Sequence, residues 1–176
     1  MRKLTAIAAF ALAGIALPAA AMTPGQASCP TDLAPAGLAA MAAQAVLSFD
    51  EAVGIDPKLD AALDKLIKAC IAREQVAAAK QEDYSRYVMS RLIYSDVKQR
   101  LEAQSVSTKV IEDAFDIGLG RRNPKSADLD EAAFSKIMRK MKDGGVDVSK
   151  LSEQALNDIS TYVVTAGDMY RLTGTI

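Results

Sequence analysis

The 176 residues include no histidine and only two cysteines, Cys29 and Cys70, so few kinds of chemistry are open to the chain. Without an imidazole it has no histidine general base, no His-based catalytic triad and no histidine-ligated zinc or haem. One nucleophile-like pattern remains, because Ser95 and Lys98 match S-x-x-K. Enzymes with this motif also need S-D-N and K-T-G elements, which the sequence lacks. We therefore interpret Ser95 and Lys98 as surface side chains one helical turn apart.

Two groups of carboxylates could bind a metal ion or act as an acid and a base. Glu112, Asp113 and Asp116 lie in IEDAFD, and Asp128, Asp130 and Glu131 lie in DLDE. The stretch KDGGVDVSKLSE does not fit the EF-hand template, because its glycine and acidic spacings differ. Acidic side chains at a helix N-terminus complement the helix dipole, which explains DLDE without a ligand. We expect no metal and no cofactor, and a hydrolase that uses carboxylates is the last alternative for function.

The first 21 residues have the pattern of a secretory signal peptide. Arg2 and Lys3 precede an apolar run to Leu17, a proline, and three alanines that form an A-x-A cleavage site. A transmembrane anchor is the alternative, since the apolar stretch to Ala21 has about 18 residues, close to the length of a membrane span. The proline and the small residues favour cleavage. We predict that residues 1–21 are removed and that the protein is periplasmic or secreted.

In an exported protein the two cysteines are expected to form a disulfide bond, because an oxidising compartment favours one. Cys70 lies in DKLIKACIARE, and Leu59 and Leu63 share its face of a predicted helix, so its thiol should point into the core. We predict a Cys29–Cys70 disulfide that ties residues 22–37, a proline-rich extended leader, to this helix. The closed loop should contribute about 4 kcal/mol to stability. An intermolecular bond through Cys29 and a redox-active bridge are the alternatives.

The charge of the mature chain argues against nucleic-acid binding. The full chain has 21 basic and 22 acidic residues, and loss of Arg2 and Lys3 would make the net charge about −3. Nucleic-acid-binding domains normally carry a basic excess. About 155 residues are enough for one buried core, so we assign residues 38–176 to a single domain.

Apolar periodicity predicts that this domain is an all-α bundle of about six helices. The predicted helices are 38–53, 57–104 with a break or kink between Ala78 and Tyr84, one that ends at Leu119, one from Asp128 to Gly144, and one from Ser152 onward. The break is required because a straight helix of this length would be far longer than a small domain. Asp96 and Arg100 form one of several stabilising i, i+4 pairs in the long helix. Gly167 in the apolar stripe of the last helix predicts close approach to another helix.

A basic segment between Gly118 and Gly145 is the feature of the sequence that best fits a binding surface. Its candidate site residues are Arg121, Arg122, Lys125, Lys136, Arg139 and Lys140. The last three share one face of a helix at i, i+3 and i+4. The simplest interpretation is an ordinary solvated helix face. The functional hypothesis is an electrostatic docking surface for an acidic protein partner or for anionic lipid.

Three classes of function remain open. The first hypothesis is an exported, non-catalytic interaction or assembly-accessory protein of the bacterial envelope that binds a protein partner through this basic segment. The second is a helical carrier of an apolar ligand such as a lipid, with methionines such as Met41 and Met89 lining the pocket. The third is the hydrolase.

Overall fold

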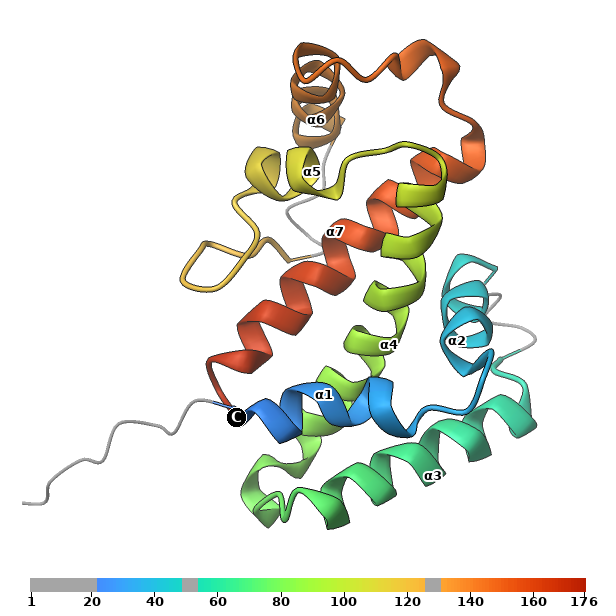
Figure 1. Ribbon diagram of the computed structural model, residues 1–176, viewed down its shortest axis with the longest axis vertical. Coiled ribbons are helices and arrows are strands. Elements are labelled where there is room, and N and C mark those ends of the chain that lie inside the picture. The colour runs from blue at the N-terminus through green and yellow to red at the C-terminus, as the bar shows by residue number, and fades with distance from the viewer. Residues whose placement is uncertain (1–21, 49–53, 126–130) are drawn as a thin grey trace, which may run out of the picture.

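The computed structural model describes residues 22–48, 54–125 and 131–176, and Figure 1 shows how they are arranged. The predicted signal peptide, residues 1–21, lies outside the described residues. Within the described part the fold is all-α, as predicted. It contains the α-helices α1 (Pro24–Leu33), α2 (Leu38–Leu47), α3 (Pro57–Arg73), α4 (Gln81–Ala103), α5 (Thr108–Phe115), α6 (Glu131–Asp143) and α7 (Glu153–Thr173), and the short 3-10 helices η1 (Ala78–Lys80) and η3 (Val148–Lys150). The prediction of about six helices is one short of these seven α-helices.

The centre of the molecule is the pair of long helices α4 and α7, which pack along each other (Figure 1). α7 contributes the stripe that the sequence predicts, with Ile159, Val163 and Ala166 buried. It begins directly after Ser152, in agreement with the predicted start, and the Ser152 hydroxyl caps it by accepting a hydrogen bond from the Ala155 N–H at 3.1 Å. α4 buries residues around much of its circumference because α7 covers one side while α1 and α2 pack on the others. α4 is therefore the central, heavily buried helix of the fold.

The prediction of an extended leader at residues 22–37 is wrong, because most of this segment is the helix α1. Thr23 caps the helix: its hydroxyl accepts from the Gln26 N–H, and the Gln26 side chain accepts from the Thr23 N–H. Pro24 stands at the first helical position, where a missing N–H costs nothing. The prolines that suggested an extended chain are therefore compatible with a helix, given this cap.

Pro30 lies inside α1, where it lacks the N–H that would bond to the Gln26 carbonyl. The Tyr84 hydroxyl of α4 donates to that carbonyl instead, at 2.9 Å. The Tyr87 hydroxyl, one turn further along α4, donates to the Ala27 carbonyl at 3.0 Å. Both tyrosine rings are buried, so α4 supplies the polar partner that the proline removes.

The predicted Cys29–Cys70 disulfide is confirmed, with the two Cα atoms 5.8 Å apart. Both cysteines are fully buried, as the helical face of Cys70 predicts. The bond joins α1 to α3, and these two helices also pack on each other. A short helix that buries little else, α1 is thereby fixed to the rest of the fold.

The long helical pattern breaks between α3 and α4, as predicted, but a few residues earlier than the expected stretch from Ala78 to Tyr84. α3 ends at Arg73, and Gln75 adopts the left-handed region with φ of 50°. The chain then passes through η1 and enters α4 at Gln81.

Two helices are shorter than predicted. α2 has Ser48 as its C-cap, and residues 49–53, which the predicted helix also contained, lie outside the described residues. α5 stops at Phe115 rather than Leu119, because Asp116 is left-handed with φ of 58°. Asp128, the predicted start of α6, is also outside the described residues.

Candidate functional site

α5 and α6 pack on each other at one end of the molecule, and we call this pair the α5–α6 lobe (Figure 1). α6 turns Ile137 and Met141 inward, where both are buried. Lys136, Arg139 and Lys140 are exposed on its other side, as their predicted spacing requires. Three of the six predicted binding residues therefore lie on one outer helix surface.

Two of the six predicted binding residues, Arg121 and Lys140, interact with Asp113 of α5. Arg121 forms an ion pair with the Asp113 carboxylate of α5 at 2.9 Å, and Lys140 donates to the Asp113 carbonyl at 3.4 Å. Lys109 also pairs with this carboxylate, at 2.8 Å. Hydrogen bonds from Lys109 and Arg121 hold the pKa of Asp113 below its usual range. Lys140 therefore connects α6 to α5, and Arg121 connects the following loop to α5, which leaves both cations less available to a partner.

The loop after α5 carries the other two predicted residues. Its shape is fixed by Asn123, a buried residue whose side-chain amide bonds both the N–H and the carbonyl of Gly118 at 2.8 Å. The Arg122 side chain is exposed, and its backbone N–H donates to Asp116 at 3.2 Å. Lys125 lines a pocket with Asp83, Arg86, Asp168, Arg171, Leu172 and Thr175, near the C-terminal end of α7. α6 lies beyond the other end of α7 (Figure 1), so the structure does not bring Lys125 together with the α6 cations.

The predicted close approach at Gly167 is real, but the neighbour is this loop rather than another helix. A Cβ atom at Gly167 would overlap the carbonyl oxygen of Pro124. The Arg171 guanidinium donates to the carbonyls of Asn123 and Pro124, at 3.0 and 2.7 Å. The loop is thus seated directly on α7.

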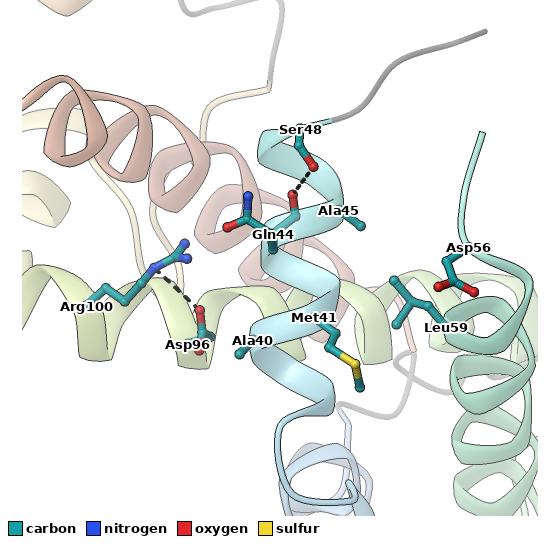
Figure 2. Close-up of a pocket in the computed structure, with 9 residues that line it drawn as sticks. All are labelled: Ala40, Met41, Gln44, Ala45, Ser48, Asp56, Leu59, Asp96 and Arg100. Carbon is teal, nitrogen blue, oxygen red and sulfur yellow. Dashed lines mark hydrogen bonds and ion pairs between the residues drawn. The ribbon is translucent and has the colours of Figure 1, made fainter. Parts of the chain in front are cut away.

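A second candidate site is an open groove around the outer face of α2, which Figure 2 shows. We call it the α2 groove. It is lined by Ala40, Met41, Gln44, Ala45 and Ser48 of α2, by Asp56 and Leu59 at the start of α3, and by Asp96 and Arg100 of α4. Its volume is about 530 Å³. In Figure 2 the α4 pair lies on one side of α2 and the α3 residues lie on the other.

The charged groups of the α2 groove continue into the core. Asp96 and Arg100 are 3.5 Å apart, and Arg100 also pairs at 2.9 Å with Asp158 of α7, a residue with 0% exposure. Burial raises the pKa of Asp158, and the negative charge of Asp96 raises it further, whereas Arg100 opposes both effects. One guanidinium is therefore shared by two carboxylates.

The sequence predicts Asp96 and Arg100 only as a helix-stabilising pair. That interpretation is correct for their spacing but does not reveal that α2 packs beside them or that Asp158 faces them from α7. The signal that could have indicated the site is an aspartate beside the apolar stripe of α7.

The residues considered for catalysis have structural partners. The Ser95 hydroxyl donates to the Leu92 carbonyl at 2.7 Å, and Lys98 lies over the Tyr94 ring, 5.7 Å from its centre. Glu112 accepts a hydrogen bond of 2.5 Å from the Tyr162 hydroxyl. Burial and this carboxylate both raise the pKa of Tyr162. Among the carboxylates of DLDE, Asp128 and Asp130 lie outside the described residues.

Over residues 22–48, 54–125 and 131–176, no three His, Cys, Asp or Glu side chains are grouped as a metal site would require. In the same part of the chain, no helix is both long and apolar enough to cross a membrane. Comparison with known proteins finds no family model, no curated protein and no solved structure that matches this chain.

Proposed function

We propose that the protein is an exported, non-catalytic interaction protein of the bacterial envelope that binds an acidic protein partner through the outer face of α6. The observation that carries the proposal is the state of Lys136 and Arg139. Both are exposed, they lie one turn apart, and among the described residues no carboxylate pairs with either. Two exposed cations on an outer helix face attract an acidic surface and accelerate encounter with it.

The surroundings of this face support the proposal. Lys140 of α6 donates to the Asp113 carbonyl and so helps to orient α6 on α5, and Arg121 pairs with the Asp113 carboxylate and fixes the loop after α5. Met141 and Ile137 anchor the opposite side of α6 in the core. The face is therefore presented on a supported helix rather than on a loose chain.

Export is the second part of the proposal. It is supported by the signal-peptide pattern of residues 1–21 and by the buried disulfide, which is typical of proteins that fold in an oxidising compartment. N-terminal sequencing of protein recovered from the periplasm tests it. We expect the mature chain to begin at Met22, and recovery of intact residues 1–21 from the membrane fraction would instead indicate an anchor.

The binding experiment compares the double variant Lys136→Gln, Arg139→Gln with the control Lys58→Gln, Lys65→Gln. The control removes the same charge from exposed positions of α3. Chemical crosslinking in periplasmic extract, followed by mass spectrometry, should identify an acidic partner that is lost with the α6 variant and retained with the control. Added salt should weaken the wild-type interaction, because exposed charges are screened over about 8 Å at physiological ionic strength. Equal crosslinking of both variants would refute the proposal.

Anionic lipid is the competing target of the same face. Sedimentation with phosphatidylglycerol vesicles, compared with phosphatidylcholine vesicles, separates the two targets. We expect little sedimentation with either. Strong sedimentation with phosphatidylglycerol alone, abolished in the α6 variant, would replace the protein partner by the membrane surface.

A carrier of an apolar ligand remains the second candidate, and the α2 groove is the observation that favours it. The groove volume is within the range of small-molecule sites, but such sites normally bury most of the ligand surface, and this groove is open. Native mass spectrometry of protein purified from the periplasm should detect a retained small molecule if the protein is a carrier.

A further inference from the structure

We propose that the α2 groove is a docking site for an amphipathic helix of a partner protein, with basic residues beside its apolar face. This goes beyond the proposed function, because the α2 groove and the outer face of α6 belong to different parts of the molecule (Figure 1). The two surfaces also differ in the sign of their charge.

The first argument is exposed apolar surface. Met41, in the groove, is 51% exposed, and Ile55, next to the groove residue Asp56, is 48% exposed. Met41 is one of the five large apolar side chains that the described part of the chain leaves exposed. A single exposed apolar residue is ordinary, but Met41 lies in a groove together with the apolar side chains of Ala40, Ala45 and Leu59, which is typical of an interaction site.

The second argument is shape. The walls of the groove at α2 are the small side chains Ala40 and Ala45, and Leu59 of α3 lies across from Met41. Small residues let two helices approach closely, since the distance between helix axes depends on the side chains at the contact. An open groove between helices suits the apolar face of a helix better than a small ligand, which needs enclosure.

The third argument is charge. Asp96 on one side and Asp56 on the other flank the apolar residues (Figure 2). Arg100 does not cancel both, because it is shared with the buried Asp158. Lysine or arginine residues at the edges of the partner helix would therefore meet carboxylates, whereas acidic residues there would meet like charge.

The experiment uses two synthetic helical peptides of equal length, one of leucine and lysine and one of leucine and glutamate, each with a fluorescent label. Binding to the full-length mature protein is measured by fluorescence anisotropy. We expect the basic peptide to bind at least about tenfold more tightly than the acidic one. Equal binding of the two peptides, or no saturable binding of the basic peptide, would overturn the proposal.

Three variants locate the site. Met41→Lys places a repelling charge in the groove and should weaken binding of the basic peptide about tenfold. Leu119→Lys makes the same change in charge at an exposed leucine outside the groove and should have less than about a twofold effect. Asp56→Asn removes a carboxylate but keeps a good N-cap for α3, so it should weaken binding without loss of helicity.

Equal weakening by the two lysine variants would mean that the peptide responds only to net charge, and would overturn the proposal. Displacement of the peptide by dodecylammonium, with tight binding of this amphiphile itself, would assign the groove to a small ligand instead. The variant Lys136→Gln, Arg139→Gln should bind the basic peptide as the wild type does, so failure of this proposal is separate from failure of the proposed function.

Discussion

The helices α1 to α3 and the α5–α6 lobe are attached to the central pair α4 and α7 by different kinds of interaction. We call the first group the N-terminal arm. Within it the disulfide fixes α1 to α3, and the arm is held to α4 by the packing of α2 and by two tyrosine hydroxyls that donate to the backbone of α1. The lobe is held by the bond from Tyr162 to Glu112 and by Arg171, which bonds to the loop between α5 and α6.

The difference at α1 follows from how little apolar surface this one helix buries. α1 buries only Cys29 and Pro30, and a helix of this length has little stability of its own. α5 and α6 bury several large side chains, among them Ile111, Phe115, Ile137 and Met141. A helix that contributes little to the core thus depends on a covalent bond and specific hydrogen bonds, whereas the lobe needs only polar contacts to be oriented.

The change with the largest expected effect on stability removes the disulfide. The double variant Cys29→Ser, Cys70→Ser avoids a free thiol and should lower the free energy of unfolding by about 2–5 kcal/mol. Urea denaturation measures the loss. Hydrogen exchange should show that α1 loses protection before α6 does. An unchanged denaturation midpoint would mean that the tyrosine hydrogen bonds hold α1 without the disulfide.

The corresponding test of the lobe replaces Gly167 of α7, which contacts the loop between α5 and α6, by alanine. A methyl group there would push against the Pro124 backbone, so Gly167→Ala should cost about 1–3 kcal/mol. Gly174→Ala is the matched control, because a methyl group at that position meets nothing closer than 3.6 Å. Equal thermal stabilities of the two variants would show that the loop moves away from α7 easily.

Tyr84→Phe tests the hydrogen bond that replaces the one lost at Pro30. It leaves the Gln26 carbonyl without its tyrosine donor and should cost about 1–2 kcal/mol in urea denaturation. In the double variant Tyr84→Phe, Pro30→Ala, the alanine N–H can bond to this carbonyl, so the loss should be smaller than the two single losses combined. Additive losses would show that the Tyr84 hydroxyl does not take the place of the N–H that Pro30 lacks.

Much of the fold could be predicted from the sequence, because the apolar periodicity of α3, α4 and α7 and the caps Asp56 and Ser152 are local signals. α1 was not predicted, since its prolines favour an extended chain unless a cap and the Tyr84 hydroxyl compensate. The Tyr84 contact joins residues far apart in the chain. No local pattern in the sequence indicates it.

The candidate sites were less predictable for the same reason. The spacing of Lys136 and Arg139 correctly predicts a shared exposed face of α6. It does not reveal that Asp113 interacts with Arg121, or that Lys125 lies at the other end of α7. The α2 groove depends on the packing of three helices, which the alanine-rich sequence of α2 does not specify.

Measurements at alkaline pH give a second test of the contribution of Tyr84 to the free energy of unfolding. Burial raises the pKa of Tyr84 far above that of an unfolded chain, which is about 10. The folded protein therefore binds more protons than the unfolded chain above pH 10, so this contribution is fully present below that pH and falls as pH rises, by at most about 1.4 kcal/mol per pH unit. Burial also raises the pKa of Tyr170, to about 12. Urea titrations between pH 9 and about 11.5 should show a shallower fall for Tyr84→Phe than for the wild type.

The smallest expected effect on stability is that of Lys136→Gln, Arg139→Gln. Both side chains lie on the outer face of α6, away from Ile137 and Met141, so the free energy of unfolding should change by less than about 0.5 kcal/mol. Arg171→Gln should destabilise the protein more, because it removes the donor to two backbone carbonyls of the loop. If the α6 variant is as stable as the wild type and still loses its partner, the face acts in binding rather than in folding. A large loss of stability in the α6 variant would show instead that these cations help to hold the lobe together. The outer face of α6 would then contribute to folding, as the contacts of the lobe with α7 do.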